Sequence, residues 1–249
     1  MKSILITGAS AGIGKGVAQA FLADGWRVGL LARSADKLQA VAQGHENARV
    51  LVADVTDATA VNAAFADFVA WAGRLDVLFN NAGMFGPAGS IDQVQDADWQ
   101  QVVDVNLNGM FYCARAAFAQ MRVQFEQAEQ AGQSGQGGGR IINNGSISAH
   151  VPREGALSYT VTKHAITGMT RQLSLDGRAF DIACGQIDIG NAHTDLLDAL
   201  IAKDPRNAPP VMNVDDVVDG LRYMAGLPLS ANVQFMTVMA TKMPYIGRG

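Results

Sequence analysis

Tyr159 and Lys163 stand four residues apart in a stretch whose apolar spacing predicts a helix. Side chains at this spacing lie on one face of a helix, so the phenol and the ammonium can act together. The pKa of a free tyrosine is about 10, too high for a base near neutrality. A positive charge about 4 Å away, at an effective dielectric constant of about 20, contributes roughly 4 kcal/mol, or about three pK units, toward the phenolate. The pair therefore predicts an acid/base group that titrates near neutrality, although the same spacing also arises by chance on solvated helix faces.

A glycine-rich turn follows the first apolar run of the chain and precedes a predicted helix, and residues 7–14 read Thr-Gly-Ala-Ser-Ala-Gly-Ile-Gly. Glycines allow positive φ angles and let the backbone approach a pyrophosphate, while a helix N-terminus supplies free N–H groups and a partial positive charge. A dinucleotide phosphate is the expected occupant, and a plain strand-to-helix turn is the alternative. The residues expected to hold the phosphate are Gly8, Ser10, Ala11, Gly12, Ile13 and Gly14.

The elements that must position these residues alternate between two kinds of apolar pattern. Seven short runs are predicted as strands: Ser3–Thr7, Arg27–Ala32, Ala48–Ala53, Leu75–Asn80, Arg140–Ser146, Asp181–Ile187 and Asn232–Ala240. Apolar residues at three- and four-residue spacing predict helices: Ile13–Ala23, Asp57–Trp71, Trp99–Phe125, Tyr159–Phe180 and Asp215–Ala225. Because most of the strands do not alternate polar with apolar residues, we expect a parallel sheet buried by helices on both faces. The expected fold is α/β, a Rossmann-type doubly wound domain over residues 1–249.

The bulk composition excludes several classes of protein. About half of the 249 residues are apolar and 17% are charged, which argues against a disordered chain. The net charge is −4 without a basic run, which argues against nucleic acid as a partner. Neither a signal peptide nor a membrane span is apparent, so a cytoplasmic location without a membrane partner is expected. Cys113 and Cys184 lack metal-type spacing and are expected to be buried thiols, with no metal site.

Two irregular segments interrupt the alternation of strands and helices. Glu126–Gly139 is rich in Gln and Gly, has no apolar stripe and is expected to form a flexible surface loop. Ala202–Val211 contains three prolines and follows a short predicted helix, Thr194–Ile201. Its place after the sixth strand makes it a candidate substrate lid, because α/β folds bind ligands beyond the carboxyl ends of their strands.

Several separate motifs, in one order, resemble those of the short-chain dehydrogenases/reductases over nearly the whole chain. They are the TGxxxGxG turn, the run Asn80-Asn81-Ala82-Gly83 after the fourth strand, and the Tyr-xxx-Lys pair with Ser146 ahead of it. The resemblance implies an oxidoreductase in which a hydride passes between nicotinamide C4 and a substrate carbon. Tyr159 would give a proton to a carbonyl oxygen or take one from an alcohol, and Lys163 would also bind the nicotinamide ribose.

The same resemblance adds two catalytic residues to the pair. Ser146 corresponds to the family's catalytic serine, whose hydroxyl would hold the substrate oxygen. Ser148 is its near rival, and a strand-end turn serine is the alternative for either. Asn106 resembles the helix asparagine whose backbone binds a water that joins the lysine to solvent. The implied catalytic set is Asn106, Ser146, Tyr159 and Lys163.

Further cofactor contacts are implied at the ends of later strands. Asp54 and Val55 resemble the family's adenine-contacting pair, unless Asp54 only caps a surface helix. After the sixth strand, Ile189 replaces the proline of the family's Pro-Gly pair. Losing this fixed φ should loosen the turn and keep the site, because backbone groups of Ile189 and Ala192 still reach the nicotinamide amide. The other contacts implied by the resemblance are Asn81, Ala82, Gly83, Tyr159, Lys163, Gly190 and Thr194.

Arg33 and Ser34, after the second strand, bear on the choice of cofactor. NAD enzymes usually place an acidic residue here to hold the ribose hydroxyls, and this chain has none. A guanidinium can bind a 2′-phosphate through paired hydrogen bonds, and the serine can add another. NADP(H) is therefore favoured. NAD(H) is the alternative, if Arg33 is only a solvated strand-end residue and Ser34 only caps the next helix.

The sequence leaves the substrate open. The segments expected to line its pocket are Phe85–Ser90, His150–Leu157 and Thr194–Met212, and they lack a cluster of charges. A neutral ketone, aldehyde or secondary alcohol is therefore expected. His150 and His193 are expected to be surface-exposed rather than to touch substrate.

Other functions compete with an NADP(H)-dependent oxidoreductase. They are a cofactor-binding regulatory or scaffold protein without chemistry, an NAD-preferring dehydrogenase, and an epimerase or dehydratase with tightly held NAD. The apolar residues of Met239–Gly249 predict burial against a neighbouring subunit. A homo-oligomer, a dimer or a homotetramer, is therefore expected.

Overall fold

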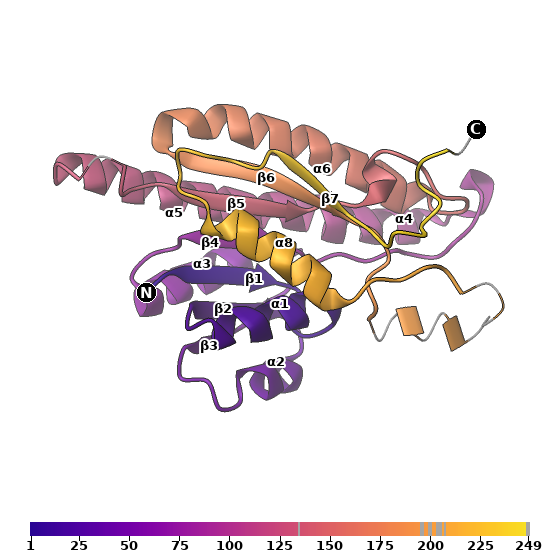
Figure 1. The fold of residues 1–249 in the computed structure, drawn as a ribbon, viewed down its shortest axis with the longest axis horizontal. Helices are drawn as coiled ribbons and strands as arrows, with labels where there is room; N and C mark the ends of the chain where they lie inside the picture. The colour runs from indigo at the N-terminus through magenta and orange to yellow at the C-terminus, as the bar shows by residue number, and fades with distance from the viewer. Residues whose placement is uncertain (134, 195–196, 199–200, 203–205, 207, 248–249) are drawn as a thin grey trace.

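The computed structural model describes residues 1–249 apart from 134, 195–196, 199–200, 203–205, 207 and 248–249. Within the described residues, seven parallel strands form one sheet in the order β3-β2-β1-β4-β5-β6-β7 (Figure 1). The strands are β1 (Ser3–Thr7), β2 (Arg27–Ala32), β3 (Ala48–Val52), β4 (Val77–Asn80), β5 (Gly139–Asn144), β6 (Ile182–Ile189) and β7 (Phe235–Val238). The chain runs outward from β1 to β3 and then returns to β4. Ligands of such folds bind at the carboxyl ends of the strands beside this reversal.

Helices cover both faces of the sheet, as predicted (Figure 1). One face packs against α1 (Gly12–Ala23), α2 (Ala35–Ala42) and α8 (Val214–Gly226). The other face packs against α3 (Ala58–Ala72), α5 (Gly109–Gln130) and α6 (Leu157–Asp176), with α4 (Asp96–Val103) beside α6. A sheet buried on both faces explains why β1 and β4 consist of residues that are buried without alternation.

The predicted seven-stranded parallel sheet is confirmed, with boundaries that differ by a few residues. β1 and β2 coincide with their predicted ranges, whereas β7 is shorter than the predicted Asn232–Ala240. β6 ends at Ile189 instead of Ile187, because Asp188 and Ile189 pair with β7. Asp188 therefore lies inside the sheet and not in the loop where the sequence placed it.

The predicted helix Trp99–Phe125 is divided into two helices. α4 passes through a π-helical turn, Asp104–Asn108, into α5. A π turn inserts an extra residue and re-aims the side chains within it. Here it carries the fully buried side chain of Asn106. The predicted helix Tyr159–Phe180 is also shorter, because α6 ends at Asp176 and a 3-10 turn, Gly177–Phe180, follows it.

The segment Glu126–Gly139 was expected to be a flexible loop, and this prediction is wrong at both ends. α5 continues to Gln130, and Ala128 is the only buried residue in its last part, Glu126–Gln130. The helix therefore extends beyond its apolar stripe. Gly139 already belongs to β5. The side chain of Gln124 anchors the turn between them by donating to the carbonyl of Gly138 at 2.9 Å.

The predicted helix Thr194–Ile201 and the predicted lid Ala202–Val211 lie partly outside the described residues, so the lid stays a prediction. Cys113 and Cys184 are buried free thiols, as expected, and burial raises the pKa of each to about 12. In the described part of the chain, no helix has both the length and the apolar character that crossing a membrane requires.

Candidate active site

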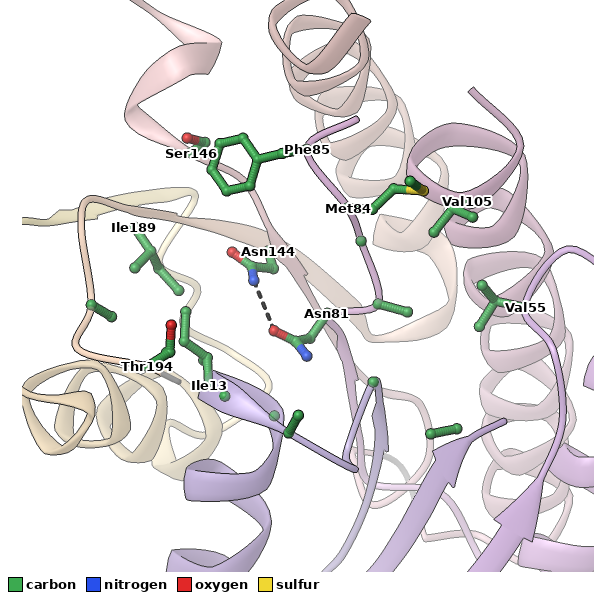
Figure 2. A pocket seen from close by; sticks show the side chains of 18 of the residues that line it. Ile13, Val55, Asn81, Met84, Phe85, Val105, Asn144, Ser146, Ile189 and Thr194 are labelled. Carbon is green, nitrogen blue, oxygen red and sulfur yellow. Dashed lines mark hydrogen bonds between the residues drawn. The ribbon is translucent and has the colours of Figure 1, made fainter. Parts of the chain in front are cut away.

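A cavity of about 630 Å³ opens at the carboxyl ends of the strands beside the reversal (Figure 2). Its size suits a ligand larger than a single ring. Every residue predicted to bind cofactor lines it: Gly8, Ser10, Ala11, Gly12, Ile13, Gly14, Arg33, Ser34, Asp54, Val55, Asn81, Ala82, Gly83, Tyr159, Lys163, Ile189, Gly190, Ala192 and Thr194. Ser146 also lines the cavity, whereas Asn106 lies behind the wall.

The glycine turn after β1 is held closely against the end of β4. A side-chain carbon at Gly14 would lie 2.3 Å from the carbonyl oxygen of Gly8, so only glycine fits there. Gly8 has a φ of +68°, which favours glycine as well. The side-chain amide of Asn81 donates to the carbonyl of Thr7 at 2.8 Å. The same Asn81 accepts a hydrogen bond from Asn144 of β5, drawn in Figure 2.

The N-terminus of α1 is open toward an anion. Ala11 occupies the capping position and supplies no side-chain acceptor, and the first turn contains no acidic residue. By contrast, Asp57 caps α3 by accepting from the amides of Thr59 and Ala60. The uncapped N–H groups and partial positive charge of α1 therefore remain for a ligand. Together with the glycine turn, this arrangement fits the pyrophosphate of a dinucleotide.

The cavity is also lined by Arg33, after β2, and by Asp54, after β3. The Arg33 guanidinium lies 3.8 Å from the Asp54 carboxylate, and both side chains are exposed. Asp54 accepts hydrogen bonds from the amide and hydroxyl of Thr56, so it is not the cap of α3. Ser34 stands at the capping position of α2 but makes no capping hydrogen bond. Arg33 and Ser34 both line the cavity, Arg33 with a long and exposed ion pair to Asp54 and Ser34 without a capping hydrogen bond.

The predicted catalytic pair, Tyr159 and Lys163, lies at the opposite end of the cavity, on the first turns of α6. Lys163 is buried and its Nζ donates to the carbonyl of Asn144 at 2.7 Å. The ammonium lies 5.5 Å from the centre of the Tyr159 ring. The ring of Phe85 stacks on that of Tyr159, with the ring centres 4.2 Å apart. The α6 backbone thus brings phenol and ammonium together, as the spacing predicted.

Burial dominates the acid–base properties of this pair. It raises the pKa of Tyr159, against the hydrogen bond from Ser146 and the positive charge of Arg153, while the negative charge of Asp188 adds to the increase. Burial also lowers the pKa of Lys163 to about 8. The expectation that Lys163 brings the pKa of Tyr159 near neutrality is therefore wrong for this structure, because both charged forms lose their hydration.

The two serines differ clearly in position. Ser146 lines the cavity, and its hydroxyl accepts from the amide of Ser148 at 3.1 Å. The Ser148 hydroxyl is buried away from the cavity and has no hydrogen-bond partner among the described residues. Of the two candidates, only Ser146 is placed to touch a substrate near Tyr159.

Asn106 acts from behind the cavity wall. Its side-chain amide accepts from the amide of Met84 and donates to the carbonyl of Met84, both at 2.8 Å. It also donates to the hydroxyl of Thr162 on α6 at 3.2 Å. The π turn therefore ties α6 to the segment that carries Phe85.

Sequence reasoning missed several groups near the catalytic end. His150 is exposed, as expected, but it is not a lone histidine, because its Nε2 lies 2.8 Å from Oδ2 of the fully buried Asp188. Arg153 lines the cavity and donates to the side chain of Asn191 at 3.1 Å. His193 pairs with the exposed Asp198. The available signal was an acidic residue, Asp188, beside the apolar Ile187 and Ile189, since a buried carboxylate needs partners.

Comparisons with known proteins agree with this geometry. A family model described as short chain dehydrogenase matches residues 2–205. The 3beta-hydroxysteroid dehydrogenase of Mediterraneibacter gnavus is 32% identical over 199 residues, which cover 78% of this chain and 67% of that protein. A short chain dehydrogenase from Burkholderia cenocepacia, solved with NADP, is 30% identical with a TM-score of 0.81 over 96% of both chains. The 3-ketoacyl-(acyl-carrier-protein) reductase of Brucella melitensis, solved with NADH, is 24% identical with a TM-score of 0.83 over 96% of both chains, a likeness of fold.

Proposed function

The chain belongs to the short-chain dehydrogenase family and is an oxidoreductase, and we propose that it uses NADP(H) to interconvert a small neutral carbonyl compound and a secondary alcohol. One observation carries the proposal: a single cavity joins an uncapped helix N-terminus at one end to Ser146, Tyr159 and Lys163 at the other. The first end suits a dinucleotide, and the second supplies a proton donor beside a hydroxyl that can orient an oxygen.

Each residue has a distinct role in this proposal. A nicotinamide cofactor, when bound here, would supply or accept the hydride. Ser146 hydrogen-bonds the substrate oxygen, and Tyr159 gives that oxygen a proton or removes one from it. Lys163 would hold the ribose of the cofactor through its ammonium. The stacked ring of Phe85 keeps water from one face of the phenol.

Tyr159→Phe tests the proposed proton transfer, because it removes the hydroxyl and keeps the ring that stacks on Phe85. Turnover of a panel of ketones, aldehydes and secondary alcohols should fall by about 10²- to 10⁴-fold, while the affinity for NADPH stays nearly unchanged. Tyr223→Phe, on the exposed surface of α8, is the matched control and should behave as wild type. Substantial turnover by Tyr159→Phe would contradict the assignment and favour another acid.

The preference for NADP(H) is proposed from Arg33 and Ser34, whose polar groups border the cavity without an acidic residue at the end of β2. Arg33→Ala should weaken binding of NADPH by about tenfold or more and leave NADH nearly unaffected, since only the former carries a 2′-phosphate. Equilibrium titration followed by nicotinamide fluorescence measures both. Arg49→Ala, which removes another exposed arginine, is the control. Equal losses for both cofactors, or tighter binding of NADH by wild type, would reverse the proposed preference.

We also propose a homo-oligomer, in which the apolar end of the chain packs on a second copy. Met243 packs against the core of its own chain, whereas Ile246 is 81% exposed. Burying the Ile246 side chain against a second subunit would remove its apolar surface from water and so stabilise the oligomer.

A further inference from the structure

A chain of buried polar side chains crosses the sheet beneath α6 and ends behind Ser146. Asn80, Asn143 and Gln186 occupy paired positions on β4, β5 and β6. Asn143 donates to the hydroxyl of Thr170 at 2.9 Å, and this hydroxyl donates to Gln186 at 3.0 Å. Each of these side chains is at most 1% exposed. Burying polar groups in this number is unfavourable unless they bond to one another, so the row has one defined arrangement.

Asp188 ends this row with a fully buried carboxylate. Its Oδ1 accepts from the side-chain amide of Gln186 at 2.7 Å and from the backbone amide of Ser146 at 3.0 Å. Its Oδ2 contacts Nε2 of His150 at 2.8 Å. The His150 side chain is 37% exposed, so it forms the end of the row that reaches solvent.

The backbone next to Ser146 is shaped for this contact. A side-chain carbon at Gly145 would lie 2.0 Å from Oδ1 of Asp188 and 2.6 Å from the side-chain nitrogen, Nε2, of Gln186. Only glycine at position 145 therefore leaves room for the Asp188 carboxylate to accept from the backbone amide of Ser146. The turn that aims the Ser146 hydroxyl is thus held by a charged hydrogen bond, which is stronger than a neutral one.

The same carboxylate binds the amide of Ser146, two residues along the chain from the Asn144 carbonyl that accepts from Lys163. Its negative charge acts to raise the pKa of Tyr159 and partly offsets the lowering of the Lys163 pKa by burial, while the positive charge of Arg153 acts to lower that of Tyr159. The Lys163 ammonium donates to a neutral carbonyl, that of Asn144. Asp188 therefore supplies an opposite charge to an ammonium that has lost its water.

We propose that Asp188 is a positioning residue, which holds the Ser146 turn and balances the charge of Lys163, and that His150 fixes its carboxylate from the solvent side. The effect on turnover rests on the proposed function. The restraint on the backbone of Ser146 does not.

Variants of His150 test the positioning role. His150→Ala removes the partner of Oδ2 and should lower kcat by about 10- to 100-fold, as displacement of a reacting group by a fraction of an ångström does. His150→Gln places an amide N–H close to the position of Nε2 and should restore most of kcat. The KM for NADPH should stay within about twofold in both variants, since His150 does not line the cavity. His164→Gln, on the exposed face of α6, is the matched control.

Asp188→Asn tests the charge, because asparagine keeps an acceptor for Ser146. Without the negative charge, the pKa of Tyr159 and that of Lys163 both fall, so the midpoint of kcat against pH for alcohol oxidation should shift to lower pH. A wild-type midpoint in Asp188→Asn would overturn the charge balance. A wild-type kcat in His150→Ala would overturn the positioning role.

Hydrogen–deuterium exchange separates failure of this proposal from failure of the proposed function. The amides of residues 144–149 should exchange about tenfold faster in His150→Ala than in wild type or His164→Gln, while those of β1 stay protected. Equal exchange overturns the proposal even if the enzyme is active. Faster exchange in His150→Ala supports the restraint on Ser146, whether or not the protein is active. If the wild-type protein binds no nicotinamide cofactor and turns over none of the panel, the proposed function is rejected and the restraint on Ser146 is not.

Discussion

At the scale of residues, the proposed catalytic end combines a buried ammonium, a half-buried phenol and a buried carboxylate. Lys163 has a pKa near 8 in the folded chain, because burial removes water from the ammonium more than Asp188 compensates. The pKa of Tyr159 lies above its ordinary value for the same reason. Motifs predicted which of these side chains meet, because helix spacing and strand ends fix their neighbourhood. They did not predict the effect of burial, which depends on Phe85 and on β6 packing around them.

Lys163 should make stability depend on pH in a way that a substitution reveals. The folded ammonium loses its proton near pH 8, whereas an unfolded lysine keeps its proton until about pH 10.4. Between these values the unfolded state binds more protons, so the free energy of unfolding rises with pH by up to about 1.4 kcal/mol per unit. Lys163→Met lacks this contribution. Urea unfolding should therefore show wild type gaining stability relative to Lys163→Met across this window.

The comparison is internally controlled, because every other titratable group is shared by the two proteins. Below the pKa of Lys163 in the folded protein, this lysine is charged in both the folded and the unfolded state. The difference in the free energy of unfolding between wild type and Lys163→Met should therefore not change with pH there. A difference that stays constant through the whole window would mean that Lys163 is hydrated in the folded protein.

At the scale of elements, the sequence predicted strands better than the irregularities inside helices. Strands buried on both faces are continuous apolar runs, so β1 and β2 were located to the residue. The π turn Asp104–Asn108 lies within one uninterrupted helical pattern, and periodicity does not reveal an inserted residue. The pairing that aligns Asn80, Asn143 and Gln186 is a property of the assembled sheet.

The sequence placed the end of β6 at Ile187 instead of Ile189. This error affected the predicted site more than the missed π turn did. Asp188 looked like a loop residue and His150 like a lone surface histidine, because the two lie 38 positions apart. Only the pairing of β6 with β7 draws Asp188 into the sheet, beside the end of β5. An acid between two isoleucines, Ile187 and Ile189, is the sequence signal that would have pointed to a buried carboxylate in need of a partner.

At the scale of the whole molecule, the reversal of strand order places two binding regions in one cavity. The turn after β1 and the ends of β2 and β3 line the end proposed to hold the dinucleotide. The end of β5 and the start of α6 line the end proposed to be catalytic. The segment after β6 borders both, as Thr194 beside the glycine turn shows (Figure 2). Ile189 therefore keeps its place in the cavity wall although it replaces a proline.

The end of the chain gives a prediction at this same scale. Ile246 is 81% exposed beyond β7, which forms one edge of the sheet. Burying an isoleucine at a subunit interface contributes roughly 1.5 to 3 kcal/mol, and an aspartate there reverses the sign. Light scattering coupled to gel filtration should give a multiple of the chain mass for wild type and a smaller mass for Ile246→Asp. Val52→Asp, on the opposite edge strand β3, should keep the wild-type mass, and an unchanged mass for Ile246→Asp would place the interface elsewhere.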